Sequence, residues 1–393
     1  MSQLSIPLDP TKTGRAAEAL ELSLRKLIVG QNEAIHQIVH RYQMYLTGLT
    51  APGRPIGNFL FLGPTGTGKT RTVEATAESL VKDARAAVKI DCAEFQHSHE
   101  IAKLIGSPPG YLGHRETHAL LSQDALNHYH TDVFKLSFVL FDEIEKASDA
   151  LWNLLLGILD KATLTLGDNR KVDFSNAMIF MTSNLGAMEM SALVSPKLGF
   201  SSCASARLAH TAADDAELDE KIERSAVGAA RRKFTPEFIN RIDKIVTFKL
   251  LTPEELRCIL DIELALIQQR IFNTSPERSF VFEATDTAKA FLLQQGIDSK
   301  YGARHLKRAI ERLLVQPMSN LIATDQVRGG DSIRIDFDPG LNSLTFLKQA
   351  EGLQVETTAG LLDGSLALPE APLTSGAPAD TPMTQTAQSS ESS

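Results

Sequence analysis

The stretch GPTGTGKT, from Gly63 to Thr70, constrains the fold of this chain more than any other. It fits the pattern Gly-x-x-x-x-Gly-Lys-Ser/Thr and stands between an apolar run, NFLFL, and an amphipathic run, TRTVEATAESLVKDA. In this pattern the glycines let successive backbone N–H groups turn inward around phosphate oxygens, and the start of the following helix adds partial positive charge. The stretch therefore predicts a strand, a phosphate-binding loop and a helix, in that order.

Continuous apolar runs predict the strands of one sheet. The five runs are NFLFLG, AAVKID, LSFVLFDE, AMIFMTSN and DKIVTFKL. Because these runs do not alternate with polar residues, we expect strands that are covered on both faces. Helical patterns lie between the runs, which favours parallel strands joined by crossover helices. We predict an α/β domain with a five-stranded parallel sheet over residues 28–250, preceded by a lead-in over residues 1–27.

A second, smaller domain is expected over residues 251–350. The run TPEELRCILDIELALIQQRIF opens with Thr252 and Glu255, which fit a capping box at a helix start. Helical patterns follow near residues 286–295 and 303–323, and DSIRIDF and SLTFLKQ predict a hairpin. This domain is predicted to be α+β and mostly helical. Beyond it, residues 351–393 are rich in Ala, Ser, Thr, Pro and Gly, so we expect a disordered acidic tail.

Charge and composition exclude some classes of protein. The formal charge is -8, but six acidic residues and no Lys or Arg follow Lys348, so the remainder is near neutral. A near-neutral body argues against general binding of duplex nucleic acid. No apolar run approaches the roughly 18 residues that span a bilayer, and the N-terminus lacks a signal-peptide pattern. The three cysteines show neither metal spacing nor a disulfide framework, which indicates a reducing cytoplasm.

Polar residues follow two of the predicted strands. FVLFDEIEKA places Asp142 and Glu143 at the carboxyl end of its strand, the edge at which parallel sheets bind ligands. We expect Asp142 and the Thr70 hydroxyl to hold Mg²⁺, and Glu143 to polarise an attacking water as a general base. The alternative is that both acids cap the following helix. MTSN places Asn184 at the tip of the next strand, to orient that water or to form a simple turn.

Two further segments predict loops. GSPPGYLGH, residues 106–114, is too rich in turn formers to be a helix or a central strand, yet it carries the large aromatic Tyr111. TLGDNRKVD, around Gly167 to Arg170, predicts either a second functional loop or a plain hairpin. The short histidine groups HSH and HYH are interpreted as surface residues rather than metal ligands, and Trp152 as part of the core.

Several phrases together resemble the Clp-type AAA+ unfoldases, and most closely the second ATPase module of the two-ring members. In chain order they are IVGQNEAI, GNFLFLGPTGTGKT, IGSPPGYLG, LFDEIEKA, VDFSNAMIFMTSNLG, FTPEFINRIDKIV and KYGARHLKRAIER. The resemblance runs from about Ile28 to Lys348 and is specific in combination, although each phrase alone is a weaker signal.

The resemblance implies ATP and Mg²⁺ as cofactors and assigns site residues. The nucleotide would be bound by Ile28, Val29, Gly30 and Gln31 on the adenine side and by Gly63, Pro64, Thr65, Gly66, Thr67, Gly68, Lys69, Thr70 and Asp142. Beside Glu143, Asn184 is similar to the first sensor, Arg304 to the second sensor, and Arg241 to an arginine finger that serves a neighbouring subunit. The alternatives are a surface ion pair with Asp243 for Arg241, and a solvent-facing helix start for Arg304.

The resemblance also implies an activity and partners. The expected protein is a ring of six identical subunits that unfolds polypeptide chains and is the ATP-binding subunit of a Clp-type protease. Gly110, Tyr111, Leu112 and Gly113 would form the pore loop that grips substrate, and Leu198, Gly199 and Phe200 would dock on a peptidase unless Phe200 folds back on its own subunit. After Gly113 the chain reads HRETH, which departs from the family pattern and leaves substrate preference open.

Three alternatives to this function remain open. They are a stand-alone remodelling chaperone, a nucleic-acid-directed motor and a regulatory subunit that does not turn ATP over. The sequence also has no counterpart of the family's substrate-recruiting domain, first ring or coiled-coil arm, since only roughly 27 residues precede the matching region. Disaggregation that relies on the arm is therefore less expected, and substrates would arrive through adaptors, exposed tails or a partner ATPase.

Overall fold

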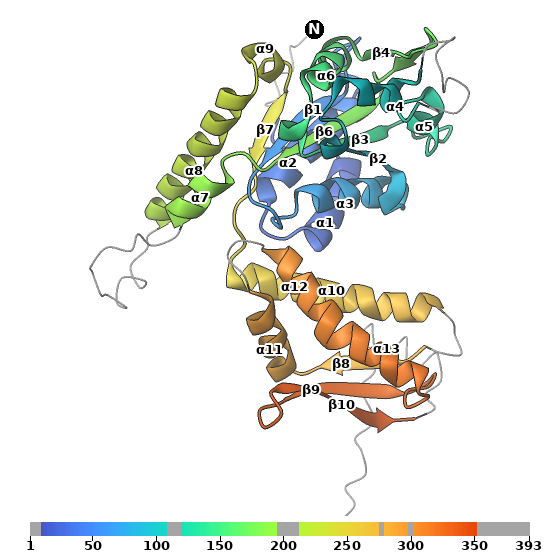
Figure 1. Cartoon of the computed structure of the whole chain (residues 1–393), viewed down its shortest axis with the longest axis vertical. Coiled ribbons are helices and arrows are strands. Elements are labelled where there is room, and N and C mark those ends of the chain that lie inside the picture. Colours follow the sequence, from blue (N-terminus) through green and yellow to red (C-terminus); the bar gives the residue numbers. More distant parts are fainter. Residues whose placement is uncertain (1–8, 108–118, 195–211, 275–278, 298–301, 352–393) are drawn as a thin grey trace, which may run out of the picture. The chain divides into compact units, whose positions relative to one another are not determined.

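The computed structural model describes residues 9–107, 119–194, 212–274, 279–297 and 302–351 of the chain (Figure 1). Two compact units interleave along the sequence. One comprises Met1–Ile267 and Asp286–Ser319, and the other Gln268–Thr285 and Asn320–Ser393. The predicted domain boundaries at residues 27, 250 and 350 stay predictions.

The first unit contains the predicted five-stranded parallel sheet. Its strand order is β2-β3-β6-β1-β7, and every pairing is parallel. The strands are β1 (Gly57–Leu62), β2 (Ala87–Asp91), β3 (Ser137–Asp142), β6 (Ala177–Ser183) and β7 (Lys244–Thr247). All residues of β1 and β6 are buried, which explains why their sequences are mainly apolar. The fold class predicted from the sequence is confirmed.

Alternate side chains of the central strands enter two separate cores. Phe59, Phe61 and Phe180 pack on one face with apolar residues of α1 (Arg15–Leu27), α2 (Asn32–Leu46) and α3 (Lys69–Val81). Leu60, Leu62 and Met181 pack on the other face with residues of α6 (Asp149–Lys161) and α8 (Ala212–Lys233). The sheet is therefore sandwiched between helical layers (Figure 1), and its carboxyl edge is held rigidly.

Shorter elements complete this unit. They are α4 (Ala102–Ile105), α5 (Gln123–Asn127), β4 (Thr163–Thr165), β5 (Lys171–Asp173), α7 (Ala187–Val194) and α9 (Pro236–Ile239). β4 and β5 pair antiparallel, so the segment around Gly167 to Arg170 is the turn of a hairpin. Trp152 packs beside the core, as expected, with its ring edge-on to Phe234 and its Nε1 donating to the Ile144 carbonyl at 3.1 Å.

The C-terminal part of the sequence is mostly helical. It contains α10 (Pro253–Thr274), α11 (Asp286–Gly296), α12 (Ala303–Ile310), α13 (Gln316–Ala323), β8 (Val281–Ala284), β9 (Ser332–Asp338) and β10 (Ser343–Ala350). The capping box is confirmed: the Thr252 amide donates to Glu255 Oε2 at 2.8 Å, and the Glu255 amide donates to Thr252 Oγ1 at 3.2 Å.

Two details of this region differ from the sequence prediction. The expected single helix over residues 303–323 is interrupted by a π-helical turn, Glu311–Val315, between α12 and α13. The expected hairpin of β9 and β10 is confirmed, but β8 adds a third strand parallel to β9. β8 has only four residues, too few for a clear alternating pattern.

Gly167, in the β4–β5 turn, touches the end of α4. Its amide donates to the Ile105 carbonyl at 2.8 Å, and a Cβ built on it would lie 2.5 Å from the Gly106 carbonyl oxygen. Because both partners are backbone atoms, a side chain at position 167 would force the two segments apart. The hairpin therefore depends on the absence of a side chain at this position.

We predict that Gly167→Ala lowers the free energy of unfolding by about 1–3 kcal/mol, a typical cost of overpacking. Gly157→Ala is the matched control, because its Cβ would meet only the Thr163 carbonyl at an ordinary 3.7 Å inside α6. There the gain in helix propensity should stabilise by roughly 0.5–1 kcal/mol. Chemical denaturation measures both variants, and a Gly167→Ala protein as stable as the wild type would contradict the contact.

Candidate nucleotide-binding site

The loop Gly63–Lys69 joins β1 to α3 in a conformation that requires glycine. Gly63, Gly66 and Gly68 have φ values of 145°, 79° and 98°. At Gly63 a side chain is also excluded by contact, because an added Cβ would lie 2.5 Å from the Phe248 carbonyl oxygen. The glycine pattern in the sequence thus corresponds to a backbone that only glycine forms without strain. This loop opens the helix α3, whose N-terminus favours anions.

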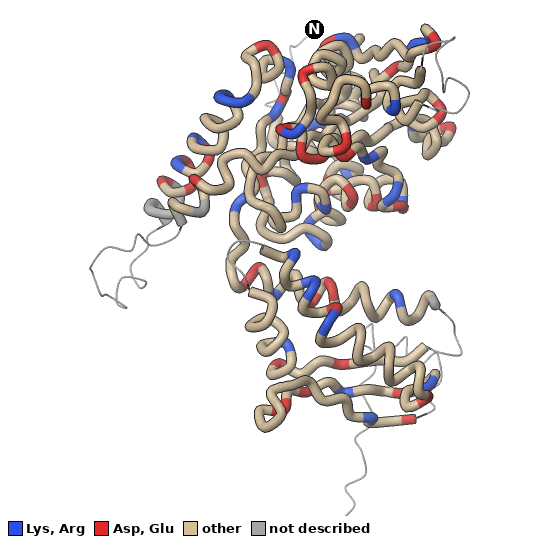
Figure 2. The backbone as a smooth tube through the Cα atoms, viewed as in Figure 1, with Lys and Arg blue, Asp and Glu red and all other residues tan. Residues whose placement is uncertain are grey.

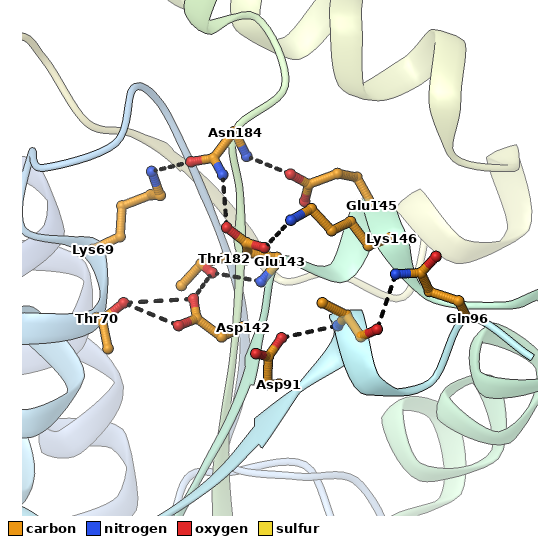
Figure 3. A network of polar contacts seen from close by, with 11 residues as sticks. Lys69, Thr70, Asp91, Gln96, Asp142, Glu143, Glu145, Lys146, Thr182 and Asn184 are labelled. Atoms are coloured by element: carbon orange, nitrogen blue, oxygen red, sulfur yellow. Dashed lines mark hydrogen bonds and ion pairs between the residues drawn. The ribbon is translucent and has the colours of Figure 1, made fainter. Parts of the chain in front are cut away.

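Lys69 is the central cation of the site and is only 8% exposed. Its Nζ donates to the carbonyls of Gly63 at 2.7 Å and Pro64 at 2.8 Å. It also donates to Asn184 Oδ1 at 3.0 Å (Figure 3). Burial lowers the pKa of Lys69 from 10.5 to about 8, while the negative charges of Glu145, Asp142 and Glu143 oppose this shift. The ammonium group therefore donates its hydrogen bonds to neutral oxygens, and an anionic phosphate would be a stronger partner.

Asp142, Thr70 and Thr182 bring hydroxyl and carboxylate oxygens together at the tip of β3. Thr70 Oγ1 lies 3.4 Å and 3.5 Å from the two carboxylate oxygens of Asp142. The Thr182 hydroxyl donates to Asp142 Oδ1 and accepts the Glu143 amide at 3.0 Å. Hard oxygens of this kind suit Mg²⁺, which is usually held by one or two protein ligands together with phosphate oxygens. Thr70 and Asp142 therefore fit the metal role predicted for them.

Glu143 and Asn184 lie next to this group. Glu143 has left-handed backbone angles, φ 55° and ψ 48°, which are uncommon for a residue with a side chain. Its Oε1 accepts from the side-chain Nδ2 of Asn184 at 3.4 Å. The backbone amide of Asn184 donates to Glu145 Oε1 at 3.1 Å. Asn184 thus contacts both Lys69 and Glu143 from the tip of β6. The structure brings together the residues that the sequence predicts for the phosphate end of the site.

A cavity of about 240 Å³ extends from these residues. Ile28, Val29, Leu251 and Ile259 give it an apolar side, which suits a flat aromatic base, and Lys69 and the acidic group give it a polar side. Of the predicted nucleotide residues, the lining includes Ile28, Val29, Thr65, Gly66, Thr67, Gly68, Lys69, Thr70 and Asp142.

Four predicted nucleotide residues do not line this cavity. Gly63 and Pro64 supply the carbonyls that hold Lys69. Gln31 is buried and ties the loop to the segment after β7, because its Nε2 donates to the carbonyls of Thr67 at 3.2 Å and Lys249 at 3.0 Å. Gly30 lies against the Glu255 carboxylate, where an added Cβ would be 2.5 Å from Oε1. Gly63, Pro64 and Gln31 therefore support the loop that contacts the cavity.

The two predicted arginines occupy different places. Arg304, at the start of α12, lines the cavity, and the neighbouring Ala303 amide donates to the Gly66 carbonyl at 3.0 Å. Its positive charge makes a small contribution to the lowered pKa of Lys69, so it lies near the phosphate loop. Arg304 is also exposed to solvent, so the alternative of a solvent-facing helix start stays open beside the predicted sensor role.

Arg241 lies away from the cavity of its own chain. It pairs with Glu237 Oε1 at 2.8 Å and with Asp160 Oδ2 at 3.8 Å. The alternative that paired it with Asp243 is wrong as to the partner, because Asp243 pairs with Arg41 at 3.2 Å and accepts the Asn58 amide at 2.8 Å.

Sequence reasoning missed three residues of this network: Thr182, Glu145 and Lys146. Thr182 precedes Asn184 by two residues, so the alternation of side chains along a strand was the signal that places both on one face. Glu145 and Lys146 belong to the acidic phrase itself, but their contacts depend on the turn Ile144–Lys146 that follows β3. Lys146 Nζ pairs with Glu143 Oε2.

The predicted pore-loop residues Gly110 to Gly113 and the predicted docking residues Leu198 to Phe200 lie outside the described residues. Within the described ranges, no group of three or more His, Cys, Asp or Glu residues is placed to hold a metal ion. His130 Nε2 lies 2.8 Å from Ser137 Oγ, and His97 stacks on His99. No helix in the described ranges is long and apolar enough to cross a bilayer.

A glycine loop after β1, a buried lysine and an acidic pair at the end of β3 define a P-loop nucleotide-binding site. Comparison with known families agrees with this geometry. Residues 54–245 match the model described as "AAA domain (Cdc48 subfamily)", and residues 251–335 match "C-terminal, D2-small domain, of ClpB protein". The chain therefore belongs to the Clp-type AAA+ ATPases.

Individual relatives support this assignment. The chain is 37% identical over 332 residues to the chaperone protein ClpB of Rhizobium meliloti (strain 1021). The matched region covers 84% of this chain and 35% of that protein. It is 36% identical over 320 residues to ClpC, an ATP-dependent Clp protease ATP-binding subunit of Staphylococcus aureus (strain USA300), with 81% and 36% covered. The chain thus spans about a third of the length of these curated relatives.

Solved structures show the same fold. A structure of the S. cerevisiae Hsp104:casein complex in an extended conformation matches with a TM-score of 0.70 and 28% identity, covering 85% of this chain and 53% of that chain. A closed-state reconstruction of Hsp104 with ATPγS and FITC-casein matches with a TM-score of 0.68. The match of residues 251–335 to the D2-small domain of ClpB confirms the resemblance to the second ATPase module.

We predict that affinity for a nucleoside triphosphate falls about tenfold from pH 7 to pH 9. With a pKa of about 8, Lys69 is charged at pH 7 and about nine-tenths neutral at pH 9 in the free protein. Phosphate oxygens raise the pKa of a lysine that binds them, so binding at pH 9 requires uptake of nearly one proton. Titration calorimetry in buffers of different ionisation enthalpy measures this uptake. Unchanged affinity without proton uptake would contradict the lowered pKa.

Proposed function

We propose that this chain is an ATP-hydrolysing protein unfoldase, which threads polypeptide through a ring and serves as the ATP-binding subunit of a Clp-type protease in the cytoplasm. The observation that carries the proposal is the contact of Asn184 with both Lys69 and Glu143. The side-chain amide of Asn184 therefore lies between Lys69, the cation that would bind phosphate, and Glu143, the candidate general base. Such an arrangement suits attack by water on a terminal phosphate.

Each residue of the site has a definite part in this reaction. The loop amides and Lys69 bind the phosphates, while Ile28 and Val29 cover the base. Thr70 and Asp142 hold Mg²⁺, which neutralises charge on the phosphate oxygens when it is bound. Glu143 takes the proton of the attacking water, which Asn184 orients.

Two arginines complete the proposed site. Arg304 contacts the terminal phosphate from α12, consistent with its place in the cavity lining. Arg241 acts on the nucleotide of a neighbouring subunit, a role consistent with its absence from the cavity lining of its own chain. An arginine supplied in this way stabilises charge in the transition state. A ring, which the family resemblance gives as six subunits, brings each Arg241 to a neighbouring site.

Polypeptide is the proposed substrate, gripped by Tyr111 of the loop Gly110 to Gly113. An aromatic side chain contacts many sequences with little directional demand. Casein in the related Hsp104 structures supports a polypeptide rather than a nucleic acid. Relatives of both kinds occur, since ClpC is named a protease subunit and ClpB a chaperone. We propose that Leu198, Gly199 and Phe200 dock on a peptidase, as the family resemblance implies, and a stand-alone chaperone is the alternative.

We predict that the full chain with ATP unfolds a tagged fluorescent protein, and that Tyr111→Ala reduces unfolding at least tenfold. The same variant should keep most of its ATP hydrolysis, because Tyr111 lies outside the nucleotide site in sequence. Loss of fluorescence measures unfolding, and release of phosphate measures turnover. Added Clp-type peptidase should convert unfolding into degradation if the protease assignment is right.

Glu143→Gln is the matched control for this experiment, because it should lower the rates of hydrolysis and unfolding together by about a hundredfold or more while nucleotide binding persists. Stimulation of turnover by single-stranded DNA instead of casein would favour the nucleic-acid motor. Undiminished unfolding by Tyr111→Ala would contradict the proposed grip on the substrate.

A further inference from the structure

The two carboxylate oxygens of Glu143 have different partners. Oε1 accepts from Asn184 Nδ2 at 3.4 Å, on the side of the cavity. Oε2 pairs with Lys146 Nζ at a shorter distance. Figure 3 shows Glu143 between these two side chains. Lys146 thus holds Oε2, while Oε1 lies next to Asn184, which in turn contacts Lys69.

The backbone around Glu143 makes this arrangement specific. Glu143 leaves β3 in the left-handed conformation, with its amide donating to Thr182 Oγ1 at 3.0 Å. The turn Ile144–Lys146 follows directly, and the Lys146 amide donates to the Glu143 carbonyl at 2.9 Å. This single turn brings residues three apart onto the same side. The strand end, the turn and the ion pair together restrict the Glu143 side chain.

Lys146 is not itself a residue of the cavity. Glu143 and Asn184 line the cavity, whereas Lys146 does not, and its side chain is 47% exposed. Hydrogen bonding and the charge of Glu143 raise the pKa of Lys146, so the side chain stays protonated at neutral pH. Glu145 and Asp91 add smaller effects of the same sign. The ion pair with Glu143 is therefore the contact that links Lys146 to the residues of the cavity.

We propose that Lys146 is a positioning residue for the candidate general base: it holds Oε2 of Glu143 so that Oε1 faces Asn184 and the phosphate site. The inference rests on the proposed role of Glu143 in ATP hydrolysis. Exposed ion pairs contribute little to the free energy of unfolding, so the consequence is expected in the rate of hydrolysis. Without Lys146 the carboxylate samples orientations in which neither oxygen faces the phosphate.

The test compares Lys146→Ala, Lys146→Met and Lys146→Arg in steady-state ATP hydrolysis by the full chain. Ala and Met should lower kcat about threefold to tenfold and leave KM within about twofold, because nucleotide binding is untouched. Arg keeps the charge and should restore at least half of the wild-type kcat. Lys221→Ala is the matched control, since it removes an exposed pair with Glu217 at 2.7 Å on α8. It should have wild-type kcat.

A double-mutant comparison tests whether Lys146 acts through Glu143. In a Glu143→Gln background, Lys146→Ala should leave the residual hydrolysis rate unchanged. If Lys146→Ala lowers the hydrolysis rate in that background by the same factor as in the wild type, the inference is overturned. Wild-type kcat in both Lys146→Ala and Lys146→Met would also overturn it. So would a Lys146→Arg variant whose kcat is as low as that of Lys146→Ala. If the wild type does not hydrolyse ATP, the proposed function itself fails, and the inference fails with it.

Discussion

The buried ammonium group of Lys69 is the interaction on which the site depends. A buried cation is costly unless it has partners, and here two loop carbonyls and the Asn184 amide oxygen supply them. Those partners are neutral, so the ammonium group has hydrogen bonds but no directly bonded negative charge. Its burial accordingly lowers the pKa of Lys69. An anionic phosphate is a better partner than any of them. The chain thus keeps a cation where water alone would have been the more favourable environment, which indicates a binding function.

The sheet makes this arrangement possible. Because β1, β3 and β6 are parallel neighbours, their carboxyl ends place the phosphate loop, the acidic pair and Asn184 at one edge. Aromatic packing of Phe59, Phe61 and Phe180 on one face keeps the strands rigid. The polar network at the edge is then small enough to be specified by a few residues. Thr182 joins Asp142 to Glu143, and Asn184 joins Glu143 to Lys69.

The sequence predicted the sheet and the phosphate end of the site because both are local patterns. Continuous apolar runs and a glycine loop with its lysine depend on neighbours in the chain. Contacts between distant segments were harder to predict. Gln31 was expected on the adenine side, but it ties Thr67 to Lys249, a partner 218 residues away. Arg241 was given the wrong alternative partner for the same reason, since Asp243 is taken by Arg41.

Other differences arise from geometry that residue types do not encode. Lys146 meets Glu143 only because the backbone turns left-handed at the end of β3, and a glutamate in that conformation has no clear sequence signal. The π-helical turn Glu311–Val315 adds one residue per turn without changing composition. β8 was missed because a four-residue strand carries too little alternation to be recognised.

Replacement of Lys69 shows whether this lysine and its loop bind the phosphates of a nucleotide. Binding of a fluorescent ATP analogue to the wild type and to Lys69→Met is measured by titration, with circular dichroism to show that both are folded. The methionine keeps the apolar part of the side chain but removes the charge. We expect tight binding by the wild type and an affinity at least a hundredfold lower in the variant. Equal affinity in two folded proteins would contradict it.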